Sequence, residues 1–118
     1  MESVSLLIRN AKVFNTYLKK FIPADVSVKD GKFYYIDRKK DTPFQADTVL
    51  DAQGKYMIPG LVDIHMHIES SMMTPEPFGD CVAAYGVTTI VSEPHEMANV
   101  KGTRGVLEMI SAAKNAPI

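Results

Sequence analysis

Residues 59–71, which read PGLVDIHMHIESS, place the strongest constraint on the fold of this chain. Their apolar residues fall on both faces of an expected strand, a pattern typical of a parallel strand buried between two layers. Side chains two positions apart on a strand share a face, so we expect His65 and His67 to lie together, with Asp63 and Glu69 on the same side. Two imidazoles at one strand end predict a divalent-metal site with His65 and His67 as ligands. The alternative is a packing role, although a buried imidazole still needs hydrogen-bond partners or a ligand.

Residues 59–118 alternate between strand and helix patterns. A helix is expected from Thr74, as N-cap, to a stop at Gly86, followed by a β-branched strand over 87–91 and a second helix from near Thr103. Two strands joined by a helix form a parallel, right-handed βαβ unit. Because a (β/α)8 barrel needs about 200 residues or more, we interpret 59–118 as the first two βα units of an incomplete TIM-type barrel, and the chain as part of a longer protein. The alternative is a complete small α+β domain.

Residues 1–58 contain several short strand patterns. Strands are expected over 4–8 and from 13, with a turn at 9–12 between them. Asp30-Gly31 predicts a hairpin between residues 24–29 and 32–36. We interpret residues 1–58 as a small antiparallel sheet or part of a small β-sandwich subdomain, and 59–118 as the barrel portion of a mixed α/β protein.

Polar residues also follow the second expected strand of the barrel portion. Sites on parallel sheets form at the carboxyl ends of the strands, and neighbouring strands lie about 4.8 Å apart. His95 and Glu96 are therefore expected to face the same pocket as His65 and His67. Glu69 and Glu96 are candidate catalytic residues, and His95 is a candidate substrate-binding or additional site residue. Solvated loop positions are the alternative for all three.

Other polar and sulfur-containing residues near these motifs have simpler expected roles. Ser70 and Ser71 are expected to form hydrogen bonds or to cap a helix, since no base adjoins them in the sequence. The methionines near the motifs are expected to pack. Cys81 lies on the expected apolar face of the first helix, so we assign it to the core.

Composition gives no indication of a nucleic-acid or membrane partner. The 118 residues carry a formal net charge of −1, so bulk charge gives no reason to expect binding to nucleic acid or membranes. Apolar runs of about 18 residues, which a transmembrane helix requires, do not occur. Cys81 is the only cysteine, which excludes an internal disulfide. Together these features favour a cytoplasmic location.

Three strings of the sequence resemble a known family. PGLVDIHMH at 59–67 resembles the opening barrel strand of the amidohydrolase superfamily. The strings HIESSMMTP at 67–75 and EPHEMANV at 93–100 resemble its adenine deaminase branch, and the resemblance covers essentially the whole chain. Ser92-Glu93 departs from the Ala-Asp expected before Pro-His-Glu in that branch.

This resemblance implies a specific chemistry. It implies hydrolytic deamination of adenine, a small purine base, to hypoxanthine and ammonia by a metal-activated hydroxide. It implies a two-metal centre, with Mn²⁺ as the first choice and Fe²⁺ or Zn²⁺ as alternatives, in which His65 and His67 bind one ion. The remaining ligands and the main acid–base residue are expected beyond Ile118, so these 118 residues alone are expected to be inactive. A homo-oligomer is also expected. The alternatives are an amidohydrolase acting on a cyclic amide or another amine, and a non-enzymatic metal-binding or structural module.

Overall fold

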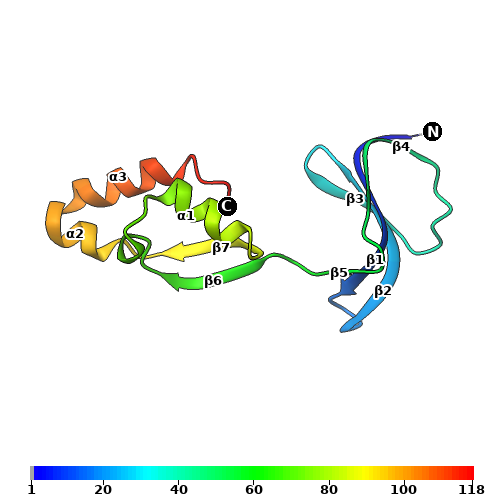
Figure 1. The fold of residues 1–118 in the computed structure, drawn as a ribbon, viewed down its shortest axis with the longest axis horizontal. Helices are drawn as coiled ribbons and strands as arrows, with labels where there is room; N and C mark the ends of the chain where they lie inside the picture. The colour runs from blue at the N-terminus through cyan, green and yellow to red at the C-terminus, as the bar shows by residue number, and fades with distance from the viewer. Residues whose placement is uncertain (1) are drawn as a thin grey trace. The chain divides into compact units, whose positions relative to one another are not determined.

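The structure, a computed structural model, describes residues 2–118, which form two compact units (Figure 1). The first unit ends at Pro59, and the second is Gly60–Ile118. The first is built from strands alone, whereas the second combines two strands with helices.

One mixed sheet makes up the first unit. Its strands are β1 (Glu2–Asn15), β2 (Lys20–Lys29), β3 (Lys32–Asp37), β4 (Phe44–Asp51) and β5 (Tyr56–Met57). They are ordered β3-β2-β1-β4, and β5 also pairs with β1. The neighbours β2 and β3 run antiparallel, but β4 and β5 run parallel to β1. Of the two alternatives predicted for residues 1–58, the small antiparallel sheet is therefore wrong, because the chain crosses from β3, at one edge, to the far side of β1.

The hairpin predicted at Asp30-Gly31 is confirmed. The two residues join β2 to β3 with φ angles of 52° and 71°. Positive φ at both central positions is the backbone conformation of a two-residue type I′ turn, which aspartate and glycine adopt at low cost.

The turn predicted at residues 9–12 is wrong, because β1 continues through it. The pairing of β1 with β2 is interrupted by a bulge between Ile8 and Ala11. Asn10 takes the extra position with φ 59°, donating from its main-chain N–H to Asp25 and from its side chain to Asp51. Asparagine tolerates this left-handed conformation, so a feature that resembles a turn in the sequence is a kink within one strand.

The second unit begins as a parallel βαβ element. Its elements are β6 (Leu61–Met66), the short helix η1 (Glu69–Ser71), α1 (Pro75–Ala83), β7 (Val87–Ser92), α2 (His95–Lys101) and α3 (Thr103–Ala113). β6 pairs with β7 in parallel, with α1 as the crossover, as the sequence predicted. Thr74 occupies the N-cap of α1, and Gly86 precedes β7 with φ 87°.

Two predictions for the helices of this unit are wrong. Helix α2 occupies residues between the expected strand over 87–91 and the helix expected from near Thr103, where no helix was predicted. Cys81 is exposed rather than part of the core. The buried side of α1 consists instead of Pro75, Phe78 and Gly79, which recur at helical spacing and leave Cys81 outside that stripe.

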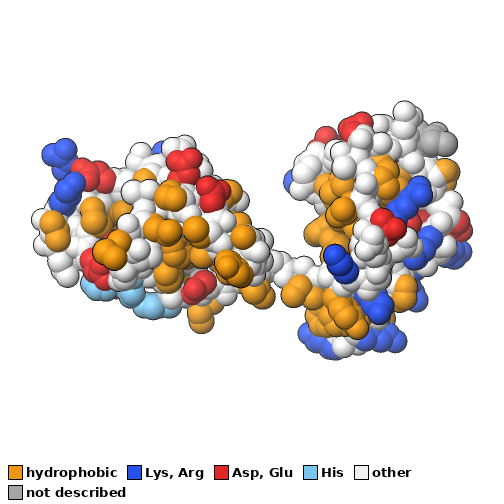
Figure 2. Space-filling view, in the orientation of Figure 1, with side chains coloured by type: hydrophobic (Ala, Val, Ile, Leu, Met, Phe, Trp, Pro, Cys, Tyr) orange, Lys and Arg blue, Asp and Glu red, His pale blue; other side chains and the backbone are white. Residues whose placement is uncertain are grey.

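Strand β6 also differs from expectation in its burial. Leu61, Val62 and Ile64 are 51%, 56% and 78% exposed, and Figure 2 shows hydrophobic side chains gathered on the surface of this unit. The sequence predicted that β6 is buried on both faces. Within residues 2–118, however, β6 has only β7 as a strand neighbour, so much of its apolar surface lacks a covering layer.

Candidate metal centre

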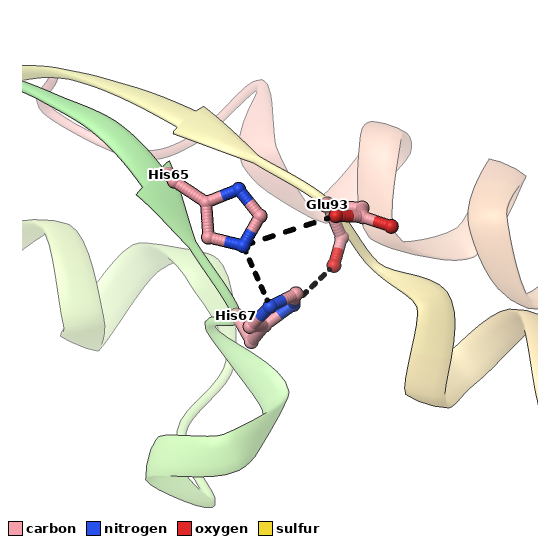
Figure 3. Close-up of side chains that lie close together, drawn as sticks. All are labelled: His65, His67 and Glu93. Atoms are coloured by element: carbon pink, nitrogen blue, oxygen red, sulfur yellow. Dashed lines mark hydrogen bonds and ion pairs between the residues drawn. The ribbon is translucent and has the colours of Figure 1, made fainter.

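Three side chains from the ends of β6 and β7 converge on one point. His65 Nε2 lies 3.0 Å from His67 Nε2 and 3.9 Å from Glu93 Oε2. The donor atoms of the three residues lie within 4.8 Å of one another (Figure 3). His65 and Glu93 are exposed and His67 is half-buried, so the cluster lies at the surface of the described residues.

The parallel pairing of β6 with β7 brings these residues together. Met66 is paired with Ser92 near the carboxyl ends of the two strands. The main-chain N–H of Glu93 then donates to the carbonyl of Met66, at 3.0 Å. His67 and Glu93 are the next residues after that final pair, so the segments that follow β6 and β7 leave the sheet at the same level.

The hydrogen bond of His67 to the main chain defines how its ring is protonated. His67 Nδ1 lies 2.8 Å from the carbonyl oxygen of Glu93. A carbonyl oxygen only accepts hydrogen bonds, so Nδ1 carries the proton. In the neutral ring, Nε2 then carries the lone pair and faces His65 Nε2. This arrangement, in which one ring nitrogen is held by a carbonyl and the other is free, is usual for histidines that bind metals.

The donor set fits a divalent ion. Metal–nitrogen bonds are about 2.0–2.1 Å long, so two of them to a shared ion readily span the 3.0 Å between the imidazole nitrogens. The 3.9 Å from His65 to the Glu93 carboxylate is also shorter than two such bonds placed in line. Imidazole with carboxylate suits zinc, iron and manganese, so the residues support a metal site and leave its ion open.

Glu93 is the member of the cluster that sequence reasoning missed as a site residue. Its position, directly after the second strand, was the available signal, because the carboxyl ends of parallel strands meet at one edge. His95 and Glu96 stand slightly further along and were singled out instead.

His95 lies beside the donor cluster without belonging to it. Its ring stands edge-on to that of His67, with centroids 4.5 Å apart and an interplanar angle of 88°. His95 is the first residue of α2, so the alternative of a solvated loop position does not hold for it.

The two candidate catalytic acids contact each other's segments and do not belong to the donor cluster. Glu69 Oε1 accepts a hydrogen bond from the main-chain N–H of Glu96, at 3.2 Å. The Ser70 hydroxyl donates to Glu96 Oε1. Ser71 donates to the carbonyl of Ile68 at 2.6 Å, so both serines form hydrogen bonds in η1, the role expected for them. The other oxygen of Glu69, Oε2, is buried without a partner among the described residues.

A parallel strand–helix–strand unit with imidazole and carboxylate side chains at its strand ends belongs to the class of α/β proteins that build their sites at that edge. Within this class, residues 56–118 match the model of the amidohydrolase family, and the chain belongs to that family. The family resemblance seen in the sequence is thus confirmed.

Curated relatives match all or nearly all of the chain. It is 49% identical over 119 residues to an adenine deaminase of Lactobacillus delbrueckii subsp. bulgaricus, covering 100% of this chain and 20% of that protein. It is 48% identical over 115 residues to an adenine deaminase of Clostridium perfringens, covering 98% and 20%. An adenine deaminase 2 of Shouchella clausii is 50% identical over 111 residues, covering 93% and 19%. The chain thus spans about a fifth of the length of these relatives.

Solved structures share the fold of most of this chain. An L-hydantoinase (dihydropyrimidinase) from Arthrobacter aurescens aligns with a TM-score of 0.66 at 28% identity, covering 77% of this chain and 21% of that one. An N-acyl-D-glutamate deacylase from Bordetella bronchiseptica, solved with zinc and a phosphonate inhibitor, aligns with a TM-score of 0.61 at 26% identity, covering 77% of this chain and 19% of that one.

Of the helices within residues 2–118, none has the length and apolar character needed to cross a bilayer.

Proposed function

We propose that these residues form the N-terminal part of an adenine deaminase, which hydrolyses adenine to hypoxanthine and ammonia. The observation that carries this proposal is the identity of about half of all positions, over the whole chain, to proteins named adenine deaminase. The convergence of His65, His67 and Glu93 at the strand ends supports it independently, because it provides donors for a divalent ion.

We assign the metal-binding role to His65 and His67, with Glu93 as a third donor. The hydrogen bond from His67 Nδ1 to the Glu93 carbonyl supports this assignment, since it leaves Nε2 free to bind. A divalent ion held there would supply Lewis acidity and lower the pKa of water at the site. Mn²⁺ is the ion we favour, with Fe²⁺ or Zn²⁺ as alternatives.

The remaining assignments concern the surroundings of this site. We propose a centre with two metal ions, whose further ligands and main acid–base residue follow Ile118 in the complete enzyme. We also propose that His95 and Glu96, which lie in the first turn of α2, are near the purine in the complete enzyme. We propose that residues 1–58 are part of a β-sandwich subdomain and that 59–118 begin a TIM-type barrel. We also propose that the complete enzyme is a cytoplasmic homo-oligomer.

Substrate identity is tested with the complete enzyme. Purified protein loaded with Mn²⁺ is incubated with adenine, and hypoxanthine and ammonia are measured together. We expect equimolar formation of the two products. The similarity to an L-hydantoinase favours a cyclic amide as the second candidate substrate. Turnover of hydantoin or dihydrouracil without any turnover of adenine would replace the proposal with that alternative, and no turnover of any of them would favour a non-enzymatic module.

The metal ligands are tested by metal content as well as activity. In His65→Ala and His67→Ala, we expect loss of bound metal and of most deaminase activity, because each variant removes an imidazole donor from the cluster. Glu93→Gln is expected to weaken binding less, since it keeps the main-chain carbonyl that holds His67. Glu76→Gln, an exposed acid in the first turn of α1, is the control. Full metal occupancy in both histidine variants contradicts the assignment.

A further inference from the structure

We infer that Glu69 is a positioning residue, which fixes the start of α2 against the metal-binding histidines, and that it does not carry protons in the reaction. This inference rests on the metal site of the proposed function. It deepens that function by giving Glu69, one of two acids near the site, a role that its contacts define.

The first step concerns how α2 begins. The first N–H groups of a helix have no partner within the helix and are usually capped by a nearby side chain. The N-cap position of α2 is Pro94, which makes no side-chain cap. Glu69, from the segment after β6, supplies the missing acceptor through Oε1, which receives the main-chain N–H of Glu96. A carboxylate at this position also interacts favourably with the helix dipole.

The second step is that the neighbouring residue makes a parallel contact. The Ser70 hydroxyl donates to the side chain of Glu96, so consecutive residues of η1 hold the same residue of α2. One contact fixes the main chain of Glu96 and the other fixes its carboxylate. We call Glu69, Ser70 and Glu96 the η1–α2 clamp.

The third step connects the η1–α2 clamp to the metal donors. The residue before Glu96 is His95, whose ring packs on that of His67. Three positions before Glu96 is Glu93, which contributes its carboxylate to the cluster and its carbonyl to His67 Nδ1. A shift of the start of α2 would therefore move two partners of His67, the ring of His95 and the carbonyl of Glu93.

The environment of the Glu69 carboxylate also favours a fixed role. Oε1 is engaged by a main-chain N–H, and Oε2 is buried without a partner among the described residues. A proton carrier needs contact with substrate or with water. Within residues 2–118, Oε2 is shielded from solvent, so the Glu69 carboxylate lacks that contact.

The substitution of Glu69 by Gln separates the two roles. Gln keeps the shape and the Oε1 acceptor but does not titrate, whereas Ala removes the acceptor. We expect Glu69→Gln to retain Mn²⁺ affinity and kcat within about threefold, a change of less than 1 kcal/mol. Glu69→Ala should weaken Mn²⁺ binding by about 10- to 100-fold, the usual effect of losing a residue that supports metal ligands.

The experiment uses the complete enzyme. Mn²⁺ affinity is measured by competition with a chelator, kcat and KM for adenine are measured with saturating Mn²⁺, and Glu76→Gln is the matched acid-to-amide control. Ser70→Ala tests the η1–α2 clamp at an exposed residue, and an affinity below that of the parent supports the inference even if Glu69→Ala does not fold. A loss of kcat by about 10²- to 10⁴-fold in Glu69→Gln, with affinity unchanged, would instead identify a proton carrier. Parental affinity in both Glu69→Ala and Ser70→Ala also overturns the inference. If the parent binds Mn²⁺ but does not deaminate adenine, the substrate proposal fails while the affinities still test Glu69.

Discussion

Gly105 allows α3 to pass close to the backbone of α2, and its replacement by alanine tests how α2 is held in place. Gly105 is buried. A Cβ at this position would lie 3.0 Å from the carbonyl carbon of Met97, and nearer still to the carbonyl oxygen, whereas ordinary contacts of a Cβ begin at 3.4 Å. Because the obstacle is main chain, it cannot rotate away, and the two helices must separate to admit the methyl group.

Two opposing effects decide whether Gly105→Ala raises or lowers the free energy of unfolding. Replacing a helical glycine by alanine favours the helix by about 1 kcal/mol. Forcing an extra methyl group into a filled contact costs about 1–3 kcal/mol, and a main-chain obstacle places this case in the upper part of that range. We therefore expect Gly105→Ala to lower the free energy of unfolding by about 1–2 kcal/mol.

Urea unfolding of the complete protein and of the variant, under identical conditions, measures this difference in the free energy of unfolding. Ser111→Ala is the control, because Ser111 lies on an exposed part of α3 and the change also favours the helix. Its stability should stay within about 0.5 kcal/mol of the parent. If Gly105→Ala is more stable than the parent, helix propensity alone decides the outcome, and the close passage of α3 over α2 is refuted.

Two further predictions concern the start of the second unit and the acid sensitivity of the first. A Cβ on Gly60 would lie 2.7 Å from Thr88 Cβ, so Gly60→Ala should destabilise the β6–β7 pair, and Thr88→Gly in the same chain should recover part of the loss; simple additivity in urea unfolding would exclude the clash. Main-chain N–H groups, that of Thr42 first and those of Lys40 and Lys39 with it, hold the pKa of Asp37 below its ordinary value. Because the folded-state pKa is lowered, this stabilisation is present above the unfolded-state pKa of about 3.9 and is lost as pH falls through the folded-state value. Between pH 6 and pH 3, the free energy of unfolding should thus fall less in Asp37→Asn than in the parent. An equal fall in both proteins would contradict a stabilising role of the Asp37 carboxylate.

Features that depend on short stretches of sequence were predictable. The hairpin at Asp30-Gly31 follows from residues that adopt positive φ, and the βαβ unit follows from the change of hydrophobic period after Pro59. The proximity of His65 and His67 was also expected, although β6 ends at Met66 and His67 lies just beyond it. The two rings still meet, with their Nε2 atoms 3.0 Å apart.

Features that depend on tertiary contacts were not predictable from the sequence. The bulge at Asn10 is stabilised by Asp25 and Asp51, which are distant in sequence. Helix α2 has a proline at its N-cap, and its capping acceptor is Glu69, from another loop. No local pattern records such a contact. Glu93 is an intermediate case: its position directly after the second strand was a signal, but its contact with the histidines depends on the pairing of Met66 with Ser92.

The exposed surface of β6 and the small number of donors in the cluster have a common explanation in the proposed barrel. A parallel strand with apolar residues on both faces is stable only when neighbouring strands and helices cover it. In a closed barrel, strands pair along every edge and bring their carboxyl ends to one level. The strands that cover Leu61, Val62 and Ile64 would therefore also deliver side chains to the end where His65, His67 and Glu93 meet. Burial of the apolar strand and completion of the metal site are thus one structural event, so the assembled barrel should bind metal far more tightly than residues 1–118 alone.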